Sequence, residues 1–396
     1  MRYLQAVKNG STLRKNSRCT NYIWLMKVII APDKFKHSLT SIEACKSIQE
    51  GLACAMPGVH TTLLPMADGG DGLLEALSFY SSAQRFVAEV SDPLSRKITA
   101  SYLISDDGET AFLEMAKASG LMLLKPEEYN PEITSTFGTG ELIKHAISKG
   151  VKKIILGIGG SATNDAGIGM AAALDFRFLD KNHKVLSPIG KNLGEIAYIE
   201  PPTLSLLSNI TFELACDVKN PLTGETGASK VYAAQKGADS LMIERLESGM
   251  RHFAKLVKEI FGKDVRQIPG AGAAGGLGVG CLVFLNATLK SGVELVFEYS
   301  KAEVNISNAD LVISGEGKLD EQSLQGKVVS GLTGLCKKYN KPLIVFCGKL
   351  ELSEAQLKDS GITAYCINDE KPATDDNLFK NAYGALRAKV ADVFRD

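Results

Sequence analysis

Short apolar runs alternate with amphipathic stretches at both ends of the chain, which is the pattern of strands followed by helices. Residues 27–32 (KVIIAP) and 60–66 (HTTLLPM) predict buried strands, and a helical spacing of leucines begins at Leu73. Between the two strands, Thr40 with Glu43 three residues later predicts a helix that begins at a capping box. The strand pattern, each time before a helical one, returns at residues 309–317, 341–348 and 362–368. This rhythm predicts a parallel sheet formed by both ends of the chain.

The middle of the chain has a different period. Apolar and polar positions alternate with period two in residues 85–90, 97–104 and 109–115. This alternation, broken by turn sequences, predicts an antiparallel meander. A further strand is predicted at residues 211–218 and a long helix at residues 240–261. We therefore expect an α/β fold in which a mixed domain with antiparallel strands, residues 83–289, is inserted into a parallel-sheet domain formed by residues 26–82 and 290–396.

Length and charge limit the classes of protein that fit. The 396 residues exceed one usual core, which agrees with two domains. Lys and Arg number 45, as do Asp and Glu, so no overall field attracts nucleic acid or an anionic membrane. No apolar run approaches the ~18 residues of a membrane span, and the eight cysteines include no C-x-x-C pair. We expect a soluble cytoplasmic protein without nucleic-acid or membrane partners.

The first 25 residues differ from the rest, because they carry five basic and no acidic side chains. A secretory signal does not fit, since Lys27 interrupts the short apolar stretch that follows. An organelle presequence and a non-native extension upstream of Met26 both fit this composition. We expect residues 1–25 to be a disordered N-terminal extension and leave them out of the fold prediction.

A glycine-rich loop, GIGGSATNDAGIG, begins at Gly157 where an apolar run ends. Glycines let a ligand approach the backbone closely, and the amides at the start of a following helix bind anions. The loop therefore predicts a phosphate site, with a tight turn between strand and helix as the alternative. The candidate residues are Gly159, Gly160, Ser161, Thr163 and Asn164.

Four further loops at predicted strand ends are rich in carboxylate, lysine or hydroxyl groups. Ligands of open α/β sheets gather at the carboxyl ends of the strands, so these loops predict one common site. Phosphoryl transfer needs cations for the phosphates, oxygen ligands for Mg²⁺ and a group that orients the attacking hydroxyl. The residues that could supply these groups are Lys34, Lys36, Lys318, Asp68, Asp71, Asp165, Asp217, Glu316 and Asp320.

Structural roles compete with chemical ones at each of these positions. Asp68 and Asp71 suit a cap for the following helix, as Asp165 does after the glycine-rich loop. Asp217, shortly before Pro221, suits an Asx turn. The lysines suit solvated loops.

Two other functions compete with phosphoryl transfer. Gly157, Gly159 and Ala162 fit the dinucleotide pattern G-x-G-x-x-A, and Gly270 begins a G-x-G-x-x-G, so an NAD-dependent dehydrogenase is one alternative. A non-catalytic regulator that binds a phosphorylated metabolite is the other. The sequence contains neither G-x-x-x-x-G-K-[ST] nor G-x-S-x-G, which argues against a P-loop and a hydrolase elbow.

Seven motifs in this order resemble those of the bacterial-type glycerate kinase family: KVIIAPDKFKHSLT, LPMADGGDG, TSTFGTGELI, GIGGSATNDAGIGMAAAL, ACDVKNPLTG, GAAGGLG and DLVISGEGKLDEQS. The resemblance extends from Met26 to about Gly348. It implies a Rossmann-like domain with the second domain inserted into it. It also implies phosphorylation of D-glycerate by ATP with Mg²⁺, with 2-phosphoglycerate favoured over 3-phosphoglycerate. Residues 1–25 and the acidic stretch 362–377 depart from the family pattern.

The resemblance lets each motif be given a role in this reaction. Asp217 or Asp320 orients the attacking hydroxyl and Lys36 neutralises charge, and these three are the predicted catalytic residues. The predicted Mg²⁺ ligands are Asp68, Asp71 and Asp165. The predicted substrate- and phosphate-binding residues are Lys34, Gly159, Gly160, Ser161, Thr163, Asn164, Gly275, Gly276, Glu316 and Lys318. Glycerate is the expected small-molecule partner. The sequence leaves open whether two copies form a homodimer.

Overall fold

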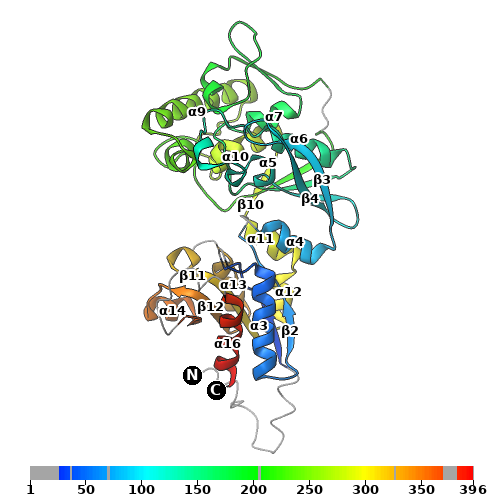
Figure 1. Cartoon of the computed structure of the whole chain (residues 1–396), viewed down its shortest axis with the longest axis vertical. Helices are drawn as coiled ribbons and strands as arrows, with labels where there is room; N and C mark the ends of the chain where they lie inside the picture. Colours follow the sequence, from blue (N-terminus) through cyan, green and yellow to red (C-terminus); the bar gives the residue numbers. More distant parts are fainter. Residues whose placement is uncertain are drawn as a thin grey trace, which may run out of the picture.

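The computed structural model describes residues 26–35, 38–68, 72–203, 207–324, 327–368 and 381–395. These residues form an elongated molecule with a parallel sheet at one end and a mixed sheet at the other, joined by a narrower waist (Figure 1). Residues 1–25 lie outside the described residues, so their expected disorder stays a prediction.

The sheet formed by the two ends of the chain has five strands, all parallel. In spatial order the strands are β13 (Ile362–Cys366), β12 (Leu343–Leu350), β11 (Leu311–Leu319), β1 (Lys27–Ile30) and β2 (His60–Leu63). Because β1 pairs with β11, the first described strand lies beside one from the carboxyl-terminal third of the chain. The predicted parallel sheet is confirmed.

Helices cover both faces of this sheet, and its three central strands β12, β11 and β1 accordingly carry runs of buried apolar residues. The helices are α3 (Ser41–Ala55), α4 (Leu73–Ser81), α11 (Gly292–Tyr299), α12 (Ala302–Ser307), α13 (Val328–Lys338), α14 (Glu354–Ser360) and α16 (Ala382–Arg395). Val28 and Ile30 share a core with α3 and α16, whereas Ile29 faces the opposite core with α12 and α13. The capping box of α3 is confirmed, because Glu43 N donates to Thr40 Oγ1 (3.2 Å) and Thr40 N donates to Glu43 Oε2 (2.9 Å).

The second sheet has six strands of mixed direction. In spatial order these are β10 (Thr288–Lys290), β9 (Thr211–Ala215), β6 (Lys153–Gly157), β5 (Thr110–Glu114), β4 (Lys97–Ile104) and β3 (Gln84–Ser91). The β3–β4 and β4–β5 pairs are antiparallel, which confirms the predicted meander. The other pairs are parallel.

Around this sheet, the described residues form six α-helices and a small two-stranded antiparallel sheet. They are α5 (Ala116–Ser119), α6 (Phe137–Ile147), α7 (Ile168–Ala173), α8 (Ala228–Tyr232), α9 (Ser240–Phe261), α10 (Ala273–Phe284), β7 (Arg177–Leu179) and β8 (Tyr198–Glu200). The bounds of α9 are those that its periodicity predicts. Among the described residues, none of the helices combines the length and the apolar character that a membrane crossing needs.

Helices α4 and α11 lie at the waist and join the two sheets through one apolar core (Figure 1). Strand β5 alternates between two cores, because Phe112 faces this shared core while Ala111 and Leu113 face the other side. Leu77 of α4 and Leu295 of α11 complete the contact with the parallel sheet. Since this core crosses the domain boundaries placed near residues 82 and 290, those boundaries stay a prediction.

Candidate active site

Acidic side chains follow the carboxyl ends of strands from both sheets. Asp33 follows β1, Asp68 follows β2, Asp217 follows β9, and Glu316 lies in the last part of β11. The Asp68 carboxylate raises the pKa of both Asp33 and Asp217, so it lies within electrostatic reach of each. The structure therefore brings together three predicted residues and adds Asp33, which sequence reasoning missed.

Asp33, which is partly buried, and the buried Glu316 are neighbours in this acidic cluster. Burial raises the pKa of Asp33 to about 7, and the nearby Asp68 adds to the shift. Burial also raises the pKa of Glu316 to about 7, with a contribution from Asp33. Lys327 lies close enough to lower both pKa values, and Lys34 N donates to Asp33 Oδ1 at 2.7 Å. Because Glu316 Oε1 is buried without a hydrogen-bond partner among the described residues, the cluster suits a cation.

The start of α11 holds Asp217 in place. Asp217 Oδ1 accepts hydrogen bonds from Ser291 Oγ (2.8 Å) and Gly292 N (3.0 Å). Burial raises the pKa of Asp217 to about 6, and Asp68 contributes to the shift. The other oxygen, Oδ2, is buried and has no hydrogen-bond partner in the described part of the chain. Asp217 thus has one oxygen fixed by the fold and one oxygen open to a proton or a ligand.

Lys318 and Asp320 belong to an ion-pair group at the end of β11. Lys318 Nζ lies 3.1 Å from Asp320 Oδ2 and 2.7 Å from Glu351 Oε2. Asp320 Oδ1 also accepts from Gln322 N (2.9 Å), at the start of the 3₁₀ turn η5 (Glu321–Leu324). Their charges are satisfied within this group, and their roles in substrate binding and catalysis stay predictions.

The glycine-rich loop after β6 is mostly buried. Gly160 is exposed, whereas Ser161, Thr163 and Asn164 are buried. The buried Lys236 donates from Nζ to Ser161 Oγ and to the Thr163 carbonyl oxygen, both at 2.7 Å. Burial lowers the pKa of Lys236 to about 7, although Asp165 opposes the shift. No sequence pattern points to Lys236, because a single lysine outside any motif predicts only a solvated side chain.

Asp165 ties this loop to the first turns of two helices. Its Oδ2 accepts from Thr136 N and Thr136 Oγ1, both at 2.8 Å, and from Gly169 N at 3.2 Å. Its Oδ1 accepts from Gly167 N at 3.1 Å. Burial raises the pKa of Asp165, and these donors lower it. The contacts are those of a helix cap, and the role of Asp165 as a metal ligand stays a prediction.

Two glycine-rich segments beside the six-stranded sheet, the loop after β6 and the first turn of α10, pack against each other through their backbones. A Cβ at Gly275 would lie 1.9 Å from the Thr163 carbonyl oxygen, and one at Gly276 would lie 2.9 Å from Ala166 Cα. Ala166 N donates to the Gly275 carbonyl at 3.1 Å. Both glycines have positive φ, +67° and +85°. This contact explains why glycine is needed at both positions, and their predicted contact with phosphate stays a prediction.

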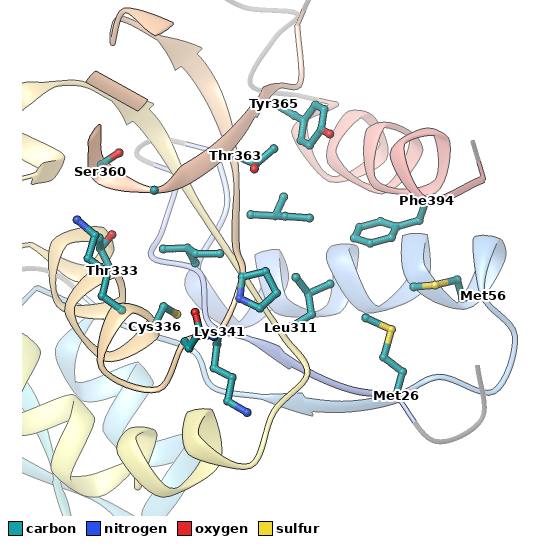
Figure 2. Close-up of a pocket in the computed structure, with 16 residues that line it drawn as sticks. Met26, Met56, Leu311, Thr333, Cys336, Lys341, Ser360, Thr363, Tyr365 and Phe394 are labelled. Carbon is teal, nitrogen blue, oxygen red and sulfur yellow. The ribbon is translucent and has the colours of Figure 1, made fainter. Parts of the chain in front are cut away.

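An apolar cavity of about 370 Å³ lies at the amino ends of the strands of the parallel sheet, opposite the carboxyl ends that carry the acidic cluster (Figure 2). Met26, Met56 and Phe394 line it, together with the first residues of β11 and β12. None of the described residues that line it carries a carboxylate. The cavity is therefore separate from the acidic cluster, and we place the active site at the cluster.

Two predicted site residues, Lys36 and Asp71, lie outside the described residues, so their roles stay predictions. Among the residues that are described, no three His, Cys, Asp or Glu side chains form a group that could hold a metal ion by itself. The missed Asp33 had a sequence signal, because it directly follows the strand motif and Pro32. Asp68 and Asp217 were predicted as site residues because each follows a predicted strand, and Asp33 occupies the same position after its own strand.

The raised pKa values predict how stability depends on pH. Without nucleotide or Mg²⁺, folded Asp33 and Glu316 hold protons up to about pH 7, whereas the unfolded chain releases them near pH 4. The protonated carboxyls of Asp33 and Glu316 stabilise the folded chain, and this contribution to the free energy of unfolding is lost as pH rises through about 7. The melting temperature should therefore fall. Asp33→Asn removes one of these charges, so it should stabilise the chain by about 1 to 3 kcal/mol at ~pH 8. Calorimetric melts in EDTA at ~pH 6 and ~pH 8 measure this, and equal pH slopes for both proteins would contradict it.

Comparisons with known proteins extend the similarity beyond the motifs. A model described as the glycerate kinase family matches residues 28–396. A Bacillus cereus protein named glycerate kinase is 41% identical over 358 residues, which cover 90% of this chain and 94% of the relative. An Escherichia coli K12 protein named glycerate 2-kinase is 42% identical over 359 residues, with the same coverage of 90% and 94%. A crystal structure from Salmonella typhimurium LT2, proposed to be glycerate kinase 2, matches with a TM-score of 0.80 and 38% identity, covering 93% of this chain and 97% of that one.

Proposed function

Because this chain belongs to the glycerate kinase family, we propose that it transfers a phosphoryl group from ATP to a hydroxyl group of D-glycerate. The name of the Escherichia coli relative supports 2-phosphoglycerate as the product. One observation carries the proposal: four acidic side chains gather where strands of both sheets end, and two of them have buried oxygens without partners among the described residues. The names of the relatives favour a kinase over a dehydrogenase or a regulator.

Asp217 is the residue that we propose to orient the attacking hydroxyl. Its Oδ2 accepts a hydrogen bond from that hydroxyl and takes up the proton as the phosphoryl group is transferred. Because α11 holds Oδ1 through Ser291 and Gly292, the carboxylate needs no rearrangement before it acts. A pKa of about 6 leaves Asp217 mostly ionised at neutral pH and still basic enough to accept a proton.

Mg²⁺ is the proposed cofactor that accompanies ATP. Proteins usually bind this ion through one or two carboxylates while water and substrate phosphates complete its coordination. The absence of a closed group of three ligands among the described residues is therefore compatible with it. The unpartnered Oε1 of Glu316 and the crowded carboxylates of Asp33 and Asp68 fit a divalent cation. When bound, the ion would neutralise phosphate charge, and Asp71 keeps its proposed role as a further ligand.

In this proposal the glycine-rich loop is a rigid segment that lines the site. Lys236, Asp165 and Gly275 hold its interior side, so only the backbone around Gly159 and Gly160 faces solvent. Backbone amides held in this way can bind a phosphate oxygen without first being ordered. The loop would therefore contribute position and shape more than charge.

The remaining parts of the proposal concern charge neutralisation and the state of the protein. Lys34 and Lys36 neutralise the substrate carboxylate or the transferring phosphate. Asp320 is the second choice for the residue that orients the hydroxyl. The protein works in the cytoplasm, and two copies pair in solution.

Incubating the full chain with ATP, Mg²⁺ and D-glycerate tests the proposed reaction. We expect ADP release that requires D-glycerate and stops when the metal is chelated, with 2-phosphoglycerate identified by ³¹P NMR. L-Glycerate and a reaction without acceptor are the controls. A folded sample that binds ATP and releases no ADP with D-glycerate would contradict the proposal, and NAD⁺ reduction by glycerate would favour the dehydrogenase.

A further inference from the structure

Strand β3 forms one edge of the six-stranded sheet. It is eight residues long, and its sequence QRFVAEVS contains neither proline nor glycine. Native edge strands are usually short, interrupted by a bulge or a proline, or covered, because their unpaired backbone groups can pair with another chain. Among the described residues, none of these protections is present from Arg85 to Glu89, where the charges of these two side chains are the remaining protection.

The register of the β3–β4 pair shows which backbone groups face outward. Asp92 N donates to the Arg96 carbonyl at 2.7 Å, one step beyond the pairing of Ser91 with Lys97. Hydrogen-bonded and non-bonded pairs alternate along an antiparallel ladder. The N–H and C=O groups of Arg85, Val87 and Glu89 therefore point away from β4. At Ser91 the open edge ends, because Ser91 N donates to the Glu141 carboxylate of α6.

The side chains of these three outward positions lie on one face of the strand. Arg85 and Glu89 are exposed, and Val87 is 54% exposed. The intervening Ala88 and Val90 point into the core. The edge thus presents a basic, an apolar and an acidic side chain in that order.

We propose that β3 pairs with β3 of a second copy of this chain in antiparallel orientation, centred on Val87. In this register Val87 lies opposite Val87 of the second copy, and Arg85 lies opposite Glu89 on both sides of the centre. A shift by two residues places a charge opposite Val87, and a shift by four sets like charges opposite each other. Charge complementarity therefore selects one register, and the pairing satisfies all outward groups of the three residues.

Charge reversal with rescue tests this pairing on the full chain. Sedimentation velocity should show a wild-type dimer that dissociates on dilution. Arg85→Glu and Glu89→Arg should each raise the dissociation constant at least about tenfold, because each sets like charges opposite in both symmetric pairs. The double variant Arg85→Glu/Glu89→Arg should restore the dimer. Lys46→Glu, an exposed charge reversal on α3, is the matched control and should leave the mass unchanged.

A backbone variant tests the pairing without changing charge. Since the Val87 N–H faces outward, Val87→Pro removes no hydrogen bond of the β3–β4 ladder. It should give a monomer with an unchanged circular dichroism spectrum. A wild-type monomer at all concentrations, or a dimer that survives both Val87→Pro and Arg85→Glu, would overturn the proposal. Because the readout is mass, the result does not depend on the proposed reaction.

Discussion

Asp217→Asn should lower the turnover number for glycerate phosphorylation by about 10²- to 10⁴-fold, the usual cost of losing a positioned general base. Asparagine keeps an oxygen at the Oδ1 position, so the bonds from Ser291 Oγ and Gly292 N persist and α11 stays capped. The substitution changes mainly Oδ2, which becomes an amide nitrogen that accepts no proton. The loss should therefore come from chemistry and leave the fold intact.

Steady-state kinetics and thermal melting separate these two effects. We expect kcat to fall while KM for ATP stays within about threefold and the melting temperature does not drop. Asp107→Asn is the matched control, because Asp107 also accepts hydrogen bonds, from Ser105 Oγ (2.6 Å) and Glu109 N (2.9 Å), in the turn between β4 and β5. A kcat for Asp217→Asn within about threefold of wild type would remove Asp217 from the reaction. The second choice, Asp320, would then be tested in the same way.

Gly275→Ala should destabilise the chain by about 3 kcal/mol or more, through steric overlap and backbone strain together. The new Cβ would lie 1.9 Å from the Thr163 carbonyl oxygen, at a residue with φ of +67°. That carbonyl also accepts from the buried Lys236 Nζ at 2.7 Å, so moving it away breaks a second contact. The variant should therefore lose the shape of the glycine-rich loop and much of its activity.

Gly334→Ala is the control for the glycine prediction. Gly334 lies within α13, and a Cβ there meets no atom within 4 Å. Alanine should stabilise this helix by about 0.5 to 1 kcal/mol, because glycine loses more backbone entropy on folding. Denaturant titration measures both variants. Equal midpoints for Gly275→Ala and wild type would mean that the two glycine segments are not tightly packed.

Local sequence patterns predicted most of the fold because secondary structure depends on neighbours a few residues apart. The capping box at Thr40 and Glu43 predicted the start of α3, and the periodicity of residues 240–261 predicted α9. The alternation of residues 85–104 predicted the first antiparallel pair. Where the motif extended past the strand, as in KVIIAPD, the position of Asp33 was available but its chemical importance was not recognised.

The site itself depended on contacts between residues far apart in the chain. Asp68 and Asp217 lie in loops after strands of different sheets, and no local pattern fixes their separation. Lys236 is buried against the Thr163 carbonyl, although its own segment carries no signal of burial. The proximity of Asp68 to Asp217 and the burial of Lys236 follow from the packing of helices against sheets, and this packing depends on the whole core.

The amino-acid sequence alone predicts the parallel sheet formed by the two ends of the chain, the antiparallel meander, several helices and the family resemblance, because these follow from periodicity and from motifs read along the chain. Three relations become visible only in the folded molecule: Asp33 joins the acidic cluster, Asp165 caps two helices, and Gly275 makes a close backbone contact. The physical reason is that burial, pKa and steric contact belong to a place in space, and packing brings residues there from distant parts of the chain.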